Sequence, residues 1–258
     1  MNTAVFLRRR QLLTLAGGLA LLPRAALASL IDTVPRIRPA VVAVGTLMAN
    51  RNPAFRFLGT GFAVGDGRLI ATNAHVLPEA LDGERMESLA IATPTTQGGA
   101  ARRAERVAVD RDRDLAILRI GGEALPALEL AADGSVREGQ DIAFTGYPIG
   151  NVLGLSPVTH RGIVSAITPI GIPQASARDL NPALVRRLAG ERFEVYQLDA
   201  TAYPGNSGSP VFDPASGRVV GVINMVFVKG TKESVLSDPS GISYAIPSRY
   251  LRALLDGL

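Results

Sequence analysis

Short apolar runs separated by turn residues recur along the chain from residue 39 onward. Aliphatic and β-branched residues dominate each run, and glycine, proline, aspartate or asparagine separates most runs from the next. Short strands at such regular spacing favour β-barrels over βαβ units, which require helices between their strands. The runs that we expect to form strands are 39–48, 58–64, 68–73, 107–109, 115–120, 142–145, 162–167, 195–198, 210–212 and 219–227.

A glycine-rich turn at residues 203–210 has the composition of a site for a nucleophile. Gly205 and Gly208 bracket Ser207, and a short apolar run follows at once. A serine hydroxyl needs a base to take its proton, and the N–H groups of such a turn can stabilise an oxyanion. A serine in a turn of this composition can also have no chemical role. The turn therefore requires support from the rest of the chain.

That support comes from one histidine and one aspartate, each next to an apolar run. His75 lies in the sequence Thr-Asn-Ala-His-Val, and Asp114 lies directly before Leu-Ala-Ile-Leu. The order along the chain is His, Asp, Ser, whereas α/β-hydrolases run Ser, Asp, His and place the serine in G-x-S-x-G. Because residue 209 is serine, that elbow motif is absent.

Taken together, segments 72–76, 113–118 and 205–210 resemble the trypsin-like serine proteases, with the bacterial HtrA/Deg branch as the nearest match. Further resemblance lies in segments 59–62, 146–150, 161–165 and 241–247. The resemblance implies an all-β fold of two six-stranded antiparallel barrels with a short C-terminal helix. We expect the N-terminal barrel at about 29–140 and the C-terminal barrel at about 141–258, with the catalytic groups in the cleft between them. No residue-level repeat links the halves.

The resemblance also assigns roles to these residues. Ser207 would be the nucleophile, His75 the general base and Asp114 the residue that orients the imidazole. The backbone N–H groups of Gly205 and Ser207, with Asn206 as a further candidate, would form the oxyanion hole. Neither a cofactor nor a metal ion is expected.

Two other titratable residues compete weakly for these roles. Asp112 precedes Asp114 by two residues, so in a strand both side chains would point to the same side. The family pattern selects Asp114, and we expect Asp112 to be a solvated loop charge. The second histidine, His160, has no role in the resemblance and is expected to be structural.

The primary specificity pocket is predicted less closely. In trypsin-like enzymes the residue six before the nucleophile lies on the pocket floor, and here that residue is Thr201. Because it is not acidic, we expect a neutral, aliphatic residue before the cleaved bond rather than Lys or Arg. Residues 222–226 should supply one wall, with Ile223 and Asn224 as candidates, but the register leaves open which of them faces the substrate.

Residues 1–28 have the order of a secretory signal peptide. Three arginines at 8–10 precede an apolar stretch that ends Ala-Leu-Ala at residue 28, after which we expect cleavage. The arginine pair also resembles a twin-arginine export signal, so both the twin-arginine and the Sec routes stay open. An uncleaved membrane anchor is disfavoured because the apolar stretch is short and Pro23 and Arg24 interrupt it. The expected location is periplasmic or secreted, with no stable membrane anchor after cleavage.

Charge and cysteine content exclude several other classes of protein. The leader holds four of the 27 basic residues and none of the acidic ones, so the remaining chain has 23 of each. A nucleic-acid partner is therefore not expected. The chain has no cysteine and only two histidines, without H-x-x-x-H spacing. Disulfides and thiolate chemistry are thus excluded, and a zinc hydrolase is poorly supported.

Two helices are predicted outside the strands. The first begins at Asn181-Pro182 and ends near Gly190, within a segment 173–194 that looks longer than its equivalent in the family. A surface excursion is favoured over a lid for that segment. The second covers 249–258, has leucines at helical spacing, and should pack on a barrel. No sequence remains after it for a PDZ domain, so we expect a stand-alone protease domain.

The leader pattern predicts export, and the resemblance implies a serine endopeptidase that cleaves unfolded or damaged polypeptides through an acyl-enzyme. One alternative is a catalytically idle relative that acts as an envelope chaperone or adaptor. Another is an esterase on the same scaffold. The natural substrate and the oligomeric state are left open.

Overall fold

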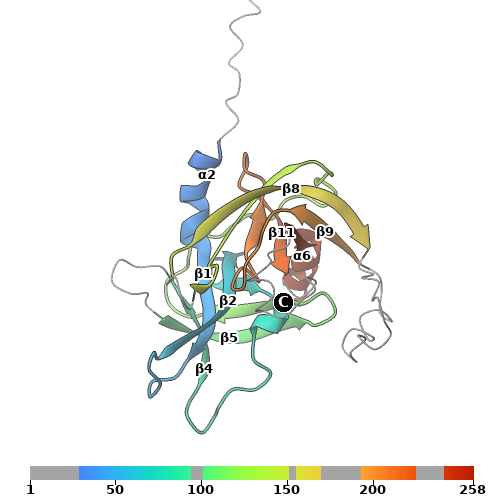
Figure 1. The fold of residues 1–258 in the computed structure, drawn as a ribbon. Helices are drawn as coiled ribbons and strands as arrows, with labels where there is room; N and C mark the ends of the chain where they lie inside the picture. Colours follow the sequence, from blue (N-terminus) through green and yellow to red (C-terminus); the bar gives the residue numbers. More distant parts are fainter. Residues whose placement is uncertain (1–28, 94–100, 151–154, 170–192, 225–240) are drawn as a thin grey trace, which may run out of the picture.

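Two closed barrels make up the computed structural model of the chain (Figure 1). It describes residues 29–93, 101–150, 155–169, 193–224 and 241–258. In these ranges each barrel has six strands, and all neighbouring strands pair antiparallel. This confirms the predicted fold class. The leader and the predicted helix near residue 181 lie outside the described residues.

The first barrel has the strand order β1-β2-β3-β6-β5-β4. Its strands are β1 (Val41–Leu47), β2 (Phe55–Val64), β3 (Leu69–Thr72), β4 (Ser88–Ala92), β5 (Ala101–Asp110) and β6 (Leu115–Ile120). The turn between β2 and β3 contains Gly65 and Gly67, both with positive φ. Such angles suit glycine because it has no Cβ. The two glycines therefore allow the tight turn that joins β2 to β3.

The second barrel has the strand order β10-β11-β12-β9-β8-β7. Its strands are β7 (Asp141–Gly146), β8 (Val158–Pro169), β9 (Glu194–Asp199), β10 (Pro210–Phe212), β11 (Val219–Asn224) and β12 (Ile242–Pro247). The turn with Ser207 directly precedes β10. It therefore lies in the second barrel, whereas His75 and Asp114 belong to the first.

The hydrophobic core has three parts. One cluster fills the first barrel and a second fills the other barrel. A third joins residues of both barrels, among them Phe62 and Phe212. In this third cluster the Tyr147 hydroxyl donates a hydrogen bond to the Val41 carbonyl at 3.1 Å, from the second barrel to the first. Burial raises the pKa of Tyr147, so this phenol stays protonated and remains a donor. The two barrels are thus packed into one body.

Short helices lie at both ends of the described chain and after β3 of the first barrel. They are α2 (Leu30–Ile37) with η2 (Arg38–Ala40), η3 (Ala74–Val76) between β3 and β4, and α6 (Ser248–Asp256). The last corresponds to the predicted C-terminal helix; it buries Leu251 and contacts β11 and β12 of the second barrel and β5 of the first. No helix within the described ranges combines the length and the apolar character needed to cross a membrane.

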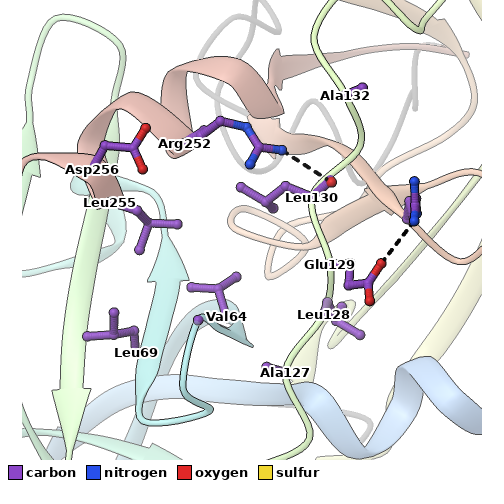
Figure 2. A pocket seen from close by; sticks show the side chains of 12 residues that line it. Val64, Leu69, Ala127, Leu128, Glu129, Leu130, Ala132, Arg252, Leu255 and Asp256 are labelled. Carbon is purple, nitrogen blue, oxygen red and sulfur yellow. Dashed lines mark hydrogen bonds and ion pairs between the residues drawn. The ribbon is translucent and has the colours of Figure 1, made fainter.

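A cavity of about 780 Å³ lies between the barrels beside α6 (Figure 2). Val64 and Leu69 of the first barrel and Leu255 of α6 form part of its apolar lining. On α6, Arg252 donates hydrogen bonds to the carbonyls of Leu130 and Ala131 in the segment that connects the barrels. None of the three residues predicted to be catalytic lines this cavity.

Candidate active site

His75 and Asp114 form a tight pair at the edge of the first barrel. His75 lies in η3 directly after β3, and Asp114 ends the turn between β5 and β6. The His75 Nδ1 atom lies 2.6 Å from Asp114 Oδ2, and the His75 backbone N–H donates to Asp114 Oδ1 at 2.9 Å. Because an ionised carboxylate only accepts hydrogen bonds, the ring proton is on Nδ1 and the Nε2 lone pair is left for another donor.

The main chain around Asp114 is fastened to the same segment. The Ala74 N–H and the Asn73 side-chain amide both donate to the Asp114 carbonyl, at 3.1 and 3.0 Å. The side chain of Asp114 is 2% exposed and that of His75 is 30% exposed. The carboxylate is thus shielded from water, while the imidazole keeps an open side on which a substrate could lie.

Asn224 supplies a third contact to the carboxylate, from the other barrel. Its Nδ2 group donates to Asp114 Oδ2 at 2.7 Å, and the residue is fully buried at the end of β11. A bond to a charged acceptor is stronger than one between neutral groups. The sequence offers Asn224 as a candidate for the substrate pocket, whereas the structure places its amide on Asp114. Sequence reasoning missed this role because it did not settle which way the β11 side chains point.

The Ser207 turn lies against strand β2 of the first barrel. The Thr60 N–H donates to the Ser207 carbonyl at 2.9 Å, and the Thr60 hydroxyl donates to the Gly205 carbonyl at 2.7 Å. A Cβ added at Gly59 would lie 2.8 Å from Val76 and 3.1 Å from the Ser207 carbonyl oxygen. Gly59 therefore lies close both to Val76, which follows His75, and to the main chain of Ser207. Thr60 was not singled out in the sequence.

Ser207 itself is 6% exposed. Among the described residues no hydrogen bond joins its hydroxyl to His75. The structure thus brings His75, Asp114 and Asn224 into contact, and the main chain and side chain of Thr60 both hydrogen-bond to the Ser207 turn. Hydrogen bonds between catalytic groups are often long without substrate and tighten when it binds.

Two N–H groups of the turn are available to an oxyanion. Within the described part of the chain, neither the Gly205 nor the Ser207 N–H donates to a protein acceptor, whereas the Asn206 N–H donates to the Tyr203 carbonyl at 2.9 Å. Gly205 has φ of 101°, and a Cβ there would lie 2.3 Å from the Tyr147 carbonyl oxygen. The turn therefore requires glycine at this position. Of the three predicted oxyanion residues, Gly205 and Ser207 keep a free donor.

The side chains of Asn206 and Ser209 point inward. Both residues are fully buried, and the Asn206 amide atoms and the Ser209 hydroxyl have no hydrogen-bond partner among the described residues. A Cβ added at Gly146 would meet both side chains, at 2.9 and 2.0 Å. These two side chains therefore pack against Gly146 of β7, the first strand of the second barrel, on the inner side of the turn.

Asp112 and His160, the other titratable residues considered for the catalytic roles, lie in surroundings unlike those of the His75–Asp114 pair. Asp112 is exposed, whereas Asp114 contacts His75. His160, on β8, stacks on Phe144 with ring centroids 4.8 Å apart and lies 6.0 Å from the Tyr203 ring. Burial lowers the pKa of His160, and its Nε2 atom is buried without a partner among the described residues.

The three predicted pocket residues do not form one surface. Thr201 is half-buried, whereas Ile223 is fully buried in the core of the second barrel. The Asn224 side-chain amide donates its hydrogen bond to Asp114. Residues 225–240, which would extend the wall, lie outside the described part of the chain. In the described ranges no three His, Cys, Asp or Glu side chains lie close enough together to hold a metal ion.

Comparison with known proteins identifies similar sequences. A family model for the trypsin-like peptidase domain matches residues 59–222, which include His75, Asp114 and Ser207. The probable periplasmic serine endoprotease DegP-like of Halomonas elongata is 31% identical over 192 residues, 74% of this chain and 33% of that protein. The mitochondrial serine protease HTRA2 of Bos taurus is 33% identical over 239 residues, 90% of this chain and 44% of that protein.

Solved structures agree on the fold. An HtrA-type protease, AlgW, with a tripeptide has a TM-score of 0.62 and 25% identity, over 88% of this chain and 62% of that chain. The serine endoprotease from Yersinia pestis has a TM-score of 0.61 and 26% identity, over 89% of this chain and 66% of that chain. The chain spans from a third to less than half of the length of the two curated relatives named above.

Proposed function

The chain belongs to the trypsin-like peptidase domain family, and on this premise we propose that it is an exported serine endopeptidase that cleaves unfolded or damaged polypeptides. Ser207 acts as nucleophile, His75 as general base and Asp114 as the group that orients the imidazole. The observation that carries this proposal is the His75–Asp114 pair, with 2.6 Å between Nδ1 and Oδ2. It leaves Nε2 as the only ring atom that can take a proton.

The first half of the reaction acylates Ser207. As the hydroxyl oxygen attacks the peptide carbonyl, its proton passes to His75 Nε2 and a C–O bond forms. The negative charge that develops on the carbonyl oxygen is stabilised by the N–H groups of Gly205 and Ser207. The C–N bond then breaks, and His75 returns the proton to the leaving amine.

The second half releases the acyl group. Water attacks the ester with the same general base, and the C–O bond to Ser207 breaks as the hydroxyl regains its proton. Each time His75 becomes cationic, Asp114 faces it at short distance. The buried amide of Asn224 holds Oδ2 in place during this step, so the carboxylate does not rotate away from the ring.

Labelling with a fluorophosphonate probe tests the assembled site. The purified chain should be labelled at Ser207, and both Ser207→Ala and His75→Ala should abolish labelling. Digestion of an unfolded protein, compared with hydrolysis of a simple ester, then separates an endopeptidase from an esterase. If the chain is not labelled but still keeps an unfolded protein from aggregating, the idle chaperone alternative is correct.

Export and substrate class form the finer part of the proposal. They are supported by the order of charge and apolar residues in segment 1–28 and by a relative whose name includes "periplasmic". Polypeptides are the substrates expected of a peptidase family. Cell fractionation followed by N-terminal sequencing tests this: we expect recovery in the periplasm or medium with a new N-terminus at Ser29. Recovery in the cytoplasm with residues 1–28 attached would exclude export.

A further inference from the structure

Asp114 has an uncommon backbone conformation. Its φ is 54°, in the left-handed region. This region costs most L-residues energy, although aspartate tolerates it better than bulky residues do. A residue stays in such a conformation when its surroundings fix it. The contacts that hold the 110–114 turn therefore decide where the Asp114 carboxylate lies.

Arg113, directly before Asp114, closes this turn. Its backbone N–H donates to Asp110 Oδ1 at 2.9 Å, and its Nη1 group donates to Asp110 Oδ2 at 3.0 Å. One carboxylate thus accepts from both the main chain and the side chain of Arg113. Because Arg113 and Asp114 share a peptide bond, a displacement of Arg113 would shift the Asp114 main chain.

The Arg113 guanidinium also contacts the second barrel. Its central carbon lies 5.1 Å from the ring centroid of Tyr250 on α6, a cation–π distance. Tyr250 is itself well fixed: its ring packs edge-on against Phe193 at 5.5 Å, and its hydroxyl accepts from the Glu194 N–H at 3.2 Å. Tyr250 therefore offers Arg113 a rigid surface that belongs to the other barrel.

We propose that Tyr250 is a positioning residue of the active site, which acts through Arg113 to hold Asp114 in the orientation that His75 requires. The inference rests on the proposed function, because it gives that site a second cross-barrel contact besides Asn224. Asn224 fixes the carboxylate directly, whereas Tyr250 fixes the turn that carries it. Relative movement of the barrels would disturb both contacts.

Arg249 provides a matched control. It lies against the same Tyr250 ring, at 4.7 Å. Its polar contacts, however, are with Glu194 at 2.6 Å, Asp133 at 3.6 Å and the Tyr250 hydroxyl at 3.1 Å, and none of these residues belongs to the 110–114 turn. Arg249→Gln should therefore weaken the surroundings of α6 without displacing Asp114, whereas Arg113→Gln should displace it.

The experiment measures two properties of the purified chain in five variants: Tyr250→Leu, Tyr250→Phe, Arg113→Gln, Arg249→Gln and the double variant Tyr250→Leu/Arg113→Gln. The first is the second-order rate of fluorophosphonate labelling between pH 5 and 9. The second is the downfield proton NMR signal of the His75 Nδ1–H···Asp114 bond, identified by its loss in His75→Gln. Thermal unfolding of each variant shows whether it is folded.

Tyr250→Leu and Arg113→Gln should each lower the labelling rate about tenfold, move the pH midpoint of labelling, and shift or broaden the NMR signal. The double variant should lose little more than either single variant, because both act through one contact. Tyr250→Phe keeps the ring, so its labelling rate and NMR signal should stay those of the unmodified chain, unlike those of Tyr250→Leu. Arg249→Gln should lower the unfolding temperature while its rate, pH midpoint and signal stay those of the unmodified chain.

An unchanged NMR signal in folded Tyr250→Leu would overturn the proposal, and so would equal losses in Arg249→Gln and Arg113→Gln. The two measurements also separate this inference from the proposed function. If Ser207 is never labelled, the proposed function fails, but the NMR signal still shows whether Tyr250 holds the His75–Asp114 pair.

Discussion

The two histidines of the chain, one in each barrel, have opposite surroundings. The His75 ring is partly exposed and bonded to a buried carboxylate. The His160 ring lies flat on Phe144 with a buried nitrogen that has no partner among the described residues. Each histidine follows a short segment of small residues, 72–74 before His75 and 157–159 before His160. Residue type alone therefore does not distinguish them. What distinguishes them is whether a carboxylate and an open side meet at the same ring.

This difference favours His75 over His160 as the proposed general base. A general base has to exchange its proton without a large cost, and Asp114 offsets the charge that His75 gains. Among the described residues no such carboxylate contacts the His160 ring, and burial lowers the pKa of His160. The lowered pKa means that the buried ring takes up a proton less readily, which disfavours a role as general base. The stacked contact with Phe144 suits a packing role.

The largest expected difference comes from removing each ring in turn. His75→Ala should lower the rate of fluorophosphonate labelling by about 10⁴-fold or more, since loss of the base in a triad removes nearly all of its effect. His160→Phe keeps an aromatic ring against Phe144 and removes only an unpartnered nitrogen. Its labelling rate should stay within about twofold of the unmodified chain, and its unfolding temperature should not fall, because an orphan polar atom is lost.

Equal losses in the two variants would show that His160 belongs to the catalytic machinery. Circular dichroism of His75→Ala provides the control for folding. Because the His75 side chain is 30% exposed, its removal should leave both barrels intact.

A smaller effect is expected when the carboxylate of the pair loses its third contact. Asn224→Leu keeps the branching at Cγ but cannot donate to Asp114, and a hydrogen bond to a charged group contributes about 1.5–3 kcal/mol. Labelling should therefore slow by about 10-fold to 150-fold at pH 7.5. Asn224→Asp should lose more, because two carboxylates would then face each other. Equal rates in Asn224→Leu and the unmodified chain would mean that Asn73 and Ala74 suffice to orient Asp114.

The fold was predictable from the sequence where strands are short, apolar and flanked by turns. β3 and β6 have nearly the bounds expected for them. β5 was expected at 107–109, but it begins at Ala101. The prediction was too short because the N-terminal half of β5 carries arginines, which remain largely outside the barrel and interrupt the apolar pattern. β4 was not predicted at all, although Ser88–Ala92 is nearly fully buried. Local pattern marks a strand poorly when its neighbours, rather than its own composition, decide its burial.

The site was predictable only for residues whose role is tied to a sequence motif. Gly205 could be expected because a turn beside a nucleophile favours a residue without Cβ. The link from Asn224 to Asp114 could not be expected, because it joins residues 110 positions apart and depends on a one-residue register in β11. A shift by one residue in a strand turns a side chain from one face to the other.

The smallest effect expected is a pH dependence of stability that His160 causes. Because burial lowers its pKa in the folded state, the unfolded chain binds this proton first as the pH falls below about 6.5. The free energy of unfolding should then decrease with falling pH, by at most about 1.4 kcal/mol per pH unit, until the folded-state pKa is passed. His160→Phe lacks this loss. Urea titrations between pH 7.5 and 5 should therefore show that the stability advantage of His160→Phe grows as the pH decreases, whereas a constant difference would mean that folding does not disfavour protonation of His160.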